Sequence, residues 1–300
     1  MNTKEKKITI LRLVIFCVLA YMPLYVITPI LNKMCGELIF SENANNYSIM
    51  INNTYSLFIM FAPSVALLLT RLFTKEGFKN TYLRLNIKGN IRYYIASIII
   101  RLIASFIIMF LIWAIFIDGI SFRITFLIGN WQVKASNFFF QLGYSLLIIF
   151  LPALGEEWGW RGYMMPKLMK LMPKSLAIII GGIIWGLWHA PLTISGHNFG
   201  IRYKFYPWLG ILIMCVFCIF MNAFLTFLTE RTKSVYPAAL CHAINNGMGD
   251  YVLLQIFAVP TALYKMPYVP GTILALVRLP VLGIIALISY LLLMRKEKEK

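Results

Sequence analysis

Long apolar stretches follow one another along the whole chain, and short polar segments separate them. A helix of roughly 20 predominantly apolar residues crosses a bilayer core of about 30 Å. The stretches are continuously apolar instead of alternating, so they predict membrane-spanning helices and not the strands of a β-barrel. Measured in this way, the pattern predicts eight spans, at 8–31, 53–73, 94–117, 138–163, 176–195, 208–229, 236–258 and 271–294.

Composition points to the same class of protein. The 300 residues are 60% hydrophobic and 13% charged, whereas soluble domains average about 45–50% apolar and about 25% charged residues. We therefore expect an all-α, polytopic bundle of transmembrane helices. No linker is long enough to separate domains, so residues 1–300 are expected to form a single integral membrane domain.

The formal net charge of +17 could indicate a nucleic-acid partner. The basic residues, however, form short runs between the apolar segments, and most of them fall on the side of the N-terminus. This distribution is typical of orientation signals in a membrane protein. It predicts the lipid bilayer and no nucleic acid as partner, both termini in the cytoplasm, and the cell membrane as location.

Ionisable residues inside spans are costly and usually mark functional sites. The fourth expected span holds two adjacent carboxylates, Glu156 and Glu157, and the fifth and seventh hold His189 and His242. The third histidine, His197, falls in a polar loop and is expected to be solvated. Arg101 and Arg278 also lie within spans, where they can snorkel or pair, and we assign them no function. Asp250 either supports the site or ends a helix.

Helical spacing separates the two carboxylates. Glu157 and Arg161 are four residues apart, so they share a helix face and can form an ion pair. Glu156 is rotated by about 100° from Glu157 and can face elsewhere. In the fifth span, Gly182 and Gly186 are expected to let the helix approach a neighbour closely.

Three short motifs carry these residues on separate spans. They are "EEWGWR" at 156–161, "WGLWH" at 185–189 and "HAINN" at 242–246, with the patterns E-E-x-x-x-R, aromatic-x-x-x-H and H-x-x-x-N. In this order they resemble the CPBP family of intramembrane endopeptidases, which includes CAAX prenyl endopeptidases and bacteriocin-processing and immunity proteins of the Abi-domain type. The resemblance covers roughly 140–260, the expected catalytic core. The family usually has Phe where this chain has Trp185.

Peptide hydrolysis needs a base to activate water, a donor for the oxyanion and an acid for the leaving amine. Glu156, desolvated within the bundle, suits the role of base. His189 could orient the water or assist proton transfer. His242 and Asn246, one helical turn apart, look like an oxyanion-binding pair. The resemblance implies the same catalytic set, namely Glu156, His189, His242 and Asn246, and we expect no cofactor.

The remaining pair, Glu157 and Arg161, is expected to brace the site, or simply to fix helix packing. His189, His242 and Asn246 have similarly plain alternatives as interior hydrogen-bonding residues. Polar groups on three helices nevertheless need one another as partners, which favours a shared site.

Other functions remain open from the sequence. Glu156, His189 and His242 could instead hold a catalytic zinc ion, although no H-E-x-x-H motif is present and Asn246 is a poor zinc ligand. A non-proteolytic immunity or signalling scaffold on the same fold is a further alternative. A transporter is least favoured, because the first half of the chain has no counterpart of the polar set. The expected substrate is a membrane-embedded or lipid-anchored protein or peptide, of CAAX or leader-peptide type, reached through a chamber opening toward the cytoplasm.

Overall fold

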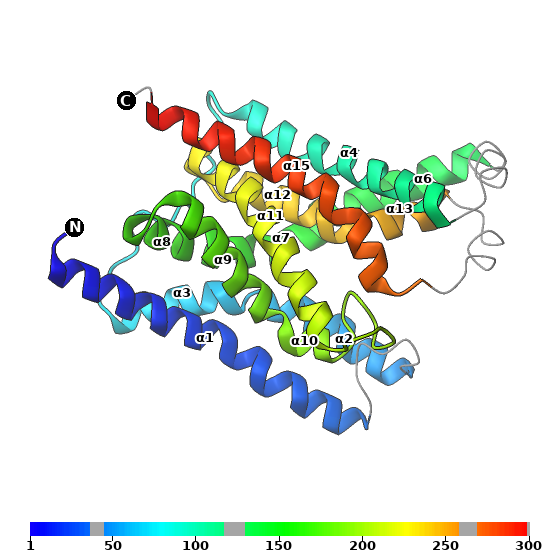
Figure 1. Cartoon of the computed structure of the whole chain (residues 1–300), viewed down its shortest axis with the longest axis horizontal. Helices are drawn as coiled ribbons and strands as arrows, with labels where there is room; N and C mark the ends of the chain where they lie inside the picture. Colours follow the sequence, from blue (N-terminus) through cyan, green and yellow to red (C-terminus); the bar gives the residue numbers. More distant parts are fainter. Residues whose placement is uncertain (37–44, 117–129, 258–268, 299–300) are drawn as a thin grey trace.

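The computed structural model describes residues 1–36, 45–116, 130–257 and 269–298, and its regular elements there are all helical (Figure 1). The predicted all-α fold is confirmed. The helices are α1 (Thr3–Cys35), α2 (Asn46–Ile59), α3 (Ala62–Phe73), α4 (Ile91–Phe116), α6 (Trp131–Tyr144), α7 (Phe150–Gly159), α8 (Met165–Leu171), α9 (Lys174–Trp188), α10 (Ala190–Ile194), α11 (Trp208–Thr232), α12 (Tyr236–Gly247), α13 (Asp250–Phe257) and α15 (Gly271–Lys298). Two π-helical turns, η1 (Ser145–Ile149) and η2 (Trp160–Met164), join α6 to α7 and α7 to α8.

Six helical segments in the described residues are long and apolar enough to cross a membrane: α1, α2 with α3, α4, α6 through α8, α11 and α15. The other two expected spans are also helical, but shorter. The fifth, α9, has 15 residues, and the seventh is divided into α12, of 12 residues, and α13, of 8. The apolar pattern locates all eight segments, but it does not register where a helix ends inside an apolar stretch.

The two termini lie at the same end of the bundle (Figure 1). The segment 74–90 lies at this end too, because it is bonded to the connection between α11 and α12. The backbone carbonyl of Tyr82 accepts a hydrogen bond there, and the side-chain amide of Asn86 donates two. We call it the terminal end. The opposite end, the far end, holds the connection 195–207 between α10 and α11.

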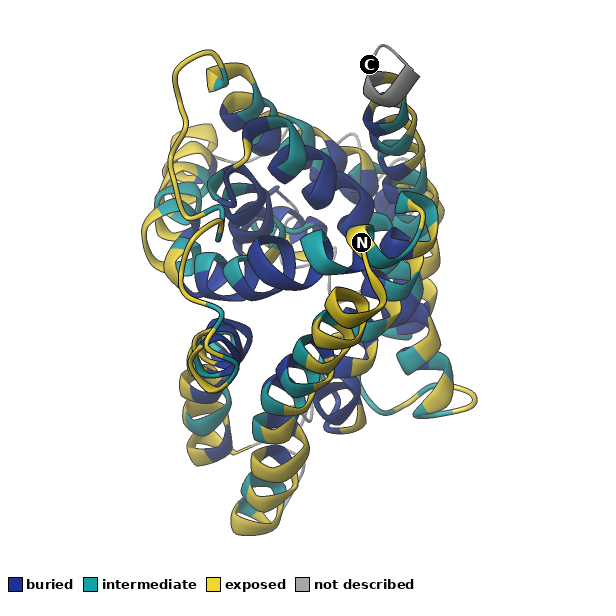
Figure 2. Cartoon of the chain, turned by 90° about the vertical axis from the view of Figure 1, so that its left-hand side faces the viewer, coloured by how far each residue is buried: buried dark blue, intermediate teal, exposed yellow. Residues whose placement is uncertain are grey.

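Apolar side chains are exposed on the outer surfaces of the peripheral helices. On α4, for example, Ile95, Ile99, Ile103 and Ile107 are 45–53% exposed and form one stripe at four-residue spacing. Figure 2 shows exposed residues on the outside of the bundle and buried faces turned inward. A bundle with an apolar exterior suits lipid as its surroundings, and the chain is a multi-pass integral membrane protein.

Glycines bring the helices of the site close to their neighbours. A Cβ atom on Gly182 would lie 2.4 Å from Cα of Ile219, and one on Gly186 would lie 2.5 Å from Cα of Cys215. These two contacts pack α9 directly on the backbone of α11, which confirms the close approach expected from their spacing. Gly159 packs α7 against α3 in the same way, since its Cβ would lie 2.5 Å from the carbonyl carbon of Pro63.

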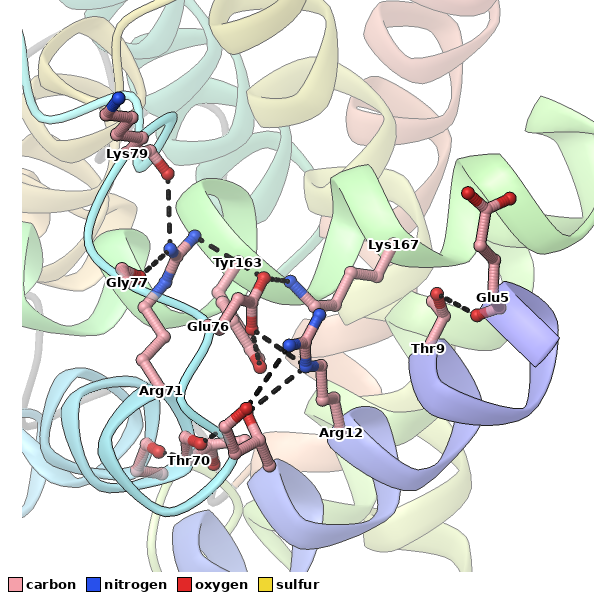
Figure 3. Close-up of polar contacts among 12 residues, drawn as sticks. Glu5, Thr9, Arg12, Thr70, Arg71, Glu76, Gly77, Lys79, Tyr163 and Lys167 are labelled. Atoms are coloured by element: carbon pink, nitrogen blue, oxygen red, sulfur yellow. Dashed lines mark hydrogen bonds and ion pairs between the residues drawn. The ribbon is translucent and has the colours of Figure 1, made fainter.

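A charged cluster joins three helical segments at the terminal end (Figure 3). Glu76 lies at its centre and contacts Lys167 Nζ at 2.6 Å, Tyr163 Oη at 2.9 Å, Arg12 Nε at 3.5 Å and Arg71 Nη2 at 3.9 Å. Burial by itself raises the pKa of Glu76, but the hydrogen bond and charge of Lys167 outweigh it and hold the pKa below its ordinary value. The cluster therefore links α1, α3 and α8 through one carboxylate.

Candidate active site

The adjacent glutamates on α7 are both buried, at 1% and 0% exposure, yet they face different surroundings. Glu156 lines a cavity of about 430 Å³ inside the bundle. Glu157 turns away, and its Oε1 accepts hydrogen bonds from Arg161 Nη1 at 3.0 Å and from His242 Nδ1 at 2.7 Å. The ion pair expected from the four-residue spacing is present, and it leaves Glu156 as the carboxylate on the cavity side.

Trp185 contacts both Glu156 and Arg161. Its Nε1 donates to Glu156 Oε1 at 2.6 Å. The guanidinium carbon of Arg161 lies 3.9 Å from the centre of the same indole ring, which is a cation–π contact. Arg161 belongs to η2, and π-helical turns of this kind occur frequently at functional sites. The indole therefore holds one oxygen of Glu156 and separates that carboxylate from the arginine.

The two histidines have fixed ring orientations. Nδ1 of His242 lies against the Glu157 carboxylate, which can only accept, so Nδ1 carries a proton and donates. Nδ1 of His189 donates in the same way to the backbone carbonyl of Trp185 at 2.9 Å. In both rings Nε2 is the remaining nitrogen, and both rings line the cavity. Backbone and carboxylate partners that fix a histidine tautomer are typical of functional sites.

The cavity brings together residues from the three predicted motifs. Its wall contains Glu156 from α7, His189 from the end of α9, and His242 and Asn246 from α12. Asn246 is exposed to this space, whereas His242 is buried at 5% exposure. The four residues that the sequence predicts as one set thus share one cavity. Glu157 and Arg161 are not among the residues that line it, but they contact its wall through His242 and Trp185.

Glu156 and His189 lie deeper in the bundle, measured from the terminal end, than the expected end of the fourth span implies. The fourth span was expected to end near Tyr163, but the helix continues to Leu171, so Glu156 lies about 22 Å from its end at a rise of about 1.5 Å per residue. His189, at the end of α9, lies equally far from Lys174, about 22 Å. The two residues therefore meet at the same level, deep in the bundle.

The cavity extends from this level toward the far end, where 197–199 and 249–252 line it. Two expectations therefore conflict: if the termini are cytoplasmic, the cavity extends toward the opposite side of the membrane. His197 is also not the solvated residue that its polar loop suggests. It is half-buried and lines the cavity, and burial lowers its pKa to about 4.

Arg101 and Arg278, which were assigned no function from the sequence, line the cavity, and so does Asp250, one of whose two expected roles was to support the site. Arg101 of α4 donates to Asn245, the neighbour of Asn246 in the sequence. Asp250 pairs with Arg278 of α15 at 3.0 Å, and both line the cavity. The signal for the two arginines was their position within apolar spans. Their partners could not be read from spacing because they lie on other helices.

The geometry also bears on a metal site. Within the described ranges, no group of three or more His, Cys, Asp and Glu side chains is placed to hold a metal ion. Nδ1 of each histidine already has a partner, as described above. Any ligand field at this site would have to use the two Nε2 atoms together with Glu156.

Comparison with known proteins supports the resemblance that the three motifs indicate. Residues 136–248 match the family model described as Type II CAAX prenyl endopeptidase Rce1-like. The chain is also similar to CAAX prenyl protease 2 of Methanococcus maripaludis, with 30% identity over 126 residues, which are 37% of this chain and 44% of that relative. The match thus spans less than half of the curated relative. All three motifs lie within the matched residues, and the predicted resemblance to the CPBP family is confirmed.

Proposed function

We propose that the chain, whose residues 136–248 match the family model described as Type II CAAX prenyl endopeptidase Rce1-like, is an intramembrane endopeptidase. It hydrolyses a peptide bond in a membrane-associated substrate with water that Glu156 activates. The observation that carries the proposal is the meeting of Glu156, His189, His242 and Asn246, from three separate helices, in one cavity.

Glu156 is the general base. Trp185 holds its Oε1, so the second carboxylate oxygen is left to accept a proton from water. A carboxylate that lies within hydrogen-bond reach of a water molecule can act as a general base toward it. The water oxygen adds to the substrate carbonyl carbon while its proton passes to Glu156. When the carbon–nitrogen bond breaks, Glu156 returns this proton to the leaving amine.

The two histidines take different roles because their partners differ. His189 donates from Nδ1 to a neutral carbonyl, so its Nε2 remains an acceptor that can orient the attacking water. His242 donates from Nδ1 to the Glu157 carboxylate, which stabilises a second proton on Nε2. That proton, with the amide group of Asn246, is directed at the oxyanion that forms on the carbonyl oxygen.

The substrate is a peptide segment held at the membrane by its own span or by a lipid anchor. A prenylated peptide with a C-terminal CAAX box is the first substrate to test, because the curated relative is named CAAX prenyl protease 2. A leader peptide of a membrane protein is the second. Comparative proteomics of membranes from wild-type and Glu156→Gln cells would identify a substrate that only the wild type cuts.

The decisive test uses the purified full-length protein in detergent and a fluorogenic farnesylated CAAX peptide. General acid–base catalysis contributes about 10²–10⁴-fold to a rate, so Glu156→Gln is expected to lower kcat by at least that order. Glu230→Gln removes a carboxylate paired with Lys233 at the terminal end and serves as the matched control. Wild-type rates in Glu156→Gln would rule out the role of Glu156 as base.

A zinc-dependent mechanism with the same residues is tested separately. If Glu156 activates water without a metal, chelation of the purified protein should leave the cleavage rate unchanged. Loss of activity on chelation, followed by recovery with zinc, would instead assign Glu156, His189 and His242 as ligands.

A further inference from the structure

Arg101 is a buried cation inside a membrane-spanning helix. It is 4% exposed, lies on α4 and lines the cavity. The ion pairs found among the described residues do not include it. A charged side chain inside a spanning helix is costly, and such residues usually face the bundle interior or a cavity. The side chain of Arg101 donates hydrogen bonds to Asn245 and Ser105, and such a costly residue in a cavity wall points to a functional role.

The hydrogen bonds of Arg101 lead directly to the site. Nε and Nη2 donate to Asn245 Oδ1 at 3.0 Å and 2.8 Å, and Nη1 donates to Ser105 Oγ at 2.6 Å. A guanidinium has only donors, so Asn245 has to turn its amide oxygen toward Arg101. The amide nitrogen of Asn245 then faces away, and it donates to Asn246 Oδ1 at 2.9 Å.

This sequence of bonds decides which end of Asn246 is available. The amide oxygen of Asn246 is engaged by Asn245, so its NH₂ group is left to donate into the cavity. An amide flipped by 180° would present its oxygen to the oxyanion and repel it. A free asparagine has no strong preference between the two orientations, whereas a donor fixed beside its oxygen selects one of them.

We propose that Arg101 is a positioning residue, which acts through Asn245 to hold the amide of Asn246 with its NH₂ group toward the oxyanion. The inference rests on the proposed function, because it presumes an oxyanion at Asn246. The positive charge of Arg101 also polarises the two amides in series, which strengthens the last donor of the series. The alternative is a purely structural bridge between α4 and α12.

Asn245→Asp is the most selective variant. A carboxylate still accepts both bonds from Arg101, but it has no hydrogen to donate to Asn246. Loss of a single oxyanion donor lowers kcat by about 10²–10³, so loss of its orientation should lower kcat by roughly 10-fold to 100-fold with little change in KM. Arg101→Lys retains the charge without the fork that two bonds to one oxygen require, and it should give a similar loss. Ser105→Ala touches Arg101 outside this series and is the control.

A double-mutant cycle on the farnesylated peptide separates positioning from structure. If Arg101 and Asn245 act through Asn246, then Asn245→Asp or Arg101→Lys should cause no further loss of kcat in an Asn246→Ala background. Additive losses, or full activity of both single variants beside an inactive Asn246→Ala, would overturn the positioning role while leaving the proposed function intact. Wild-type rates in Asn246→Ala would overturn both the oxyanion role of Asn246 and this inference. A wild-type protein that cuts no peptide would overturn the proposed function and the inference with it.

Discussion

At the scale of single residues, Trp185 contacts four other residues of the site, although the sequence pattern indicates only its spacing from His189. Its indole N–H donates to Glu156, its backbone carbonyl accepts from His189, and its ring covers the Arg161 guanidinium. The ring also packs against His242, with centroids 5.6 Å apart. A Phe side chain at this position would retain every one of these contacts except the hydrogen bond to Glu156.

Trp185→Phe therefore isolates that hydrogen bond. A hydrogen bond to a charged group contributes about 1.5–3 kcal/mol, and we expect the variant to lose roughly tenfold to a hundredfold in kcat/KM while it stays folded. Steady-state cleavage of the farnesylated peptide and a thermal melt in detergent would measure the two effects. Unchanged kcat/KM would show that the indole N–H does not support the base.

At this scale the sequence is enough to group the four residues that the cavity brings together. The residues of the predicted set are separated by one helical turn or by a change of helix, so spacing and polarity in apolar surroundings are enough to identify them. The hydrogen bonds of Arg101 and Asn245 could not be predicted, because the contact joins two helices separated by 144 positions in the chain. His197 was misplaced because a polar loop need not face solvent when it covers a cavity.

At the scale of helices, close backbone contacts set the positions of the side chains in the candidate active site. α9 has His189 at its end, and Gly182 and Gly186 fix the distance of this helix from α11. Protein interiors are close-packed, so an added methyl group at such a contact moves a helix instead of filling a void. A displacement of α9 would carry His189 and Trp185 away from Glu156 together.

Gly186→Ala should therefore reduce both stability and activity. Overpacking a well-packed contact costs about 1–3 kcal/mol, and we expect a lower Tm together with a reduced kcat. Gly283→Ala is the matched control on α15, because its Cβ would meet only the ring of Phe220, at 3.4 Å or more. Equal melting temperatures and rates for the two variants would contradict the role of the α9–α11 contact.

The lengths of the helices were less predictable than their existence. The fourth helix continues through "EEWGWRGYMM" to Leu171, although hydropathy falls there. Its polar groups find partners within the protein, as Glu157 does in Arg161 and Tyr163 in Glu76. Conversely, α9 ends at Trp188 within an apolar stretch, and the imidazole of the next residue, His189, bonds the carbonyl of Trp185. Hydropathy measures the cost of polarity and does not register such pairing.

At the scale of the whole molecule, the orientation of the bundle decides from which side the cavity is reached. The termini and the Glu76 cluster mark one end, and the cavity extends toward the other. The basic residues between the spans predict a cytoplasmic terminal end. The same rule then places the deeper part of the cavity toward the outer side, contrary to the expected chamber.

Cysteine labelling in intact cells would test this arrangement. In a variant without the five native cysteines, single cysteines replace Lys4 at the terminal end and Tyr251, which is 59% exposed and lines the cavity. A membrane-impermeant maleimide is expected to label Tyr251→Cys from outside and Lys4→Cys only after the cells are opened. Labelling of both from the same side would contradict the topology.

The Glu76 cluster predicts a pH dependence of stability at the terminal end. The pKa of Glu76 is lower in the folded protein than the ordinary value of about 4.3. The carboxylate thus stabilises the fold above that ordinary value, and this stability is lost as pH falls through the folded pKa. We expect Glu76→Gln to cost about 1–2 kcal/mol at pH 7, and the difference in Tm from wild type should vanish in acid. A difference that stays constant down to about pH 3 would contradict this assignment.

The short fifth helix has a consequence for the lipid around it. Leu176, Ile179, Ile183 and Leu187 form an exposed apolar stripe along α9, but a helix of 15 residues is only about 22 Å long. A hydrocarbon core of about 30 Å cannot match that stripe without thinning locally. The membrane beside α9 should therefore be locally thinner, which brings headgroups and water toward the level of Glu156. The proposed endopeptidase would thus draw its water partly from a deformation of the bilayer that its own shape imposes.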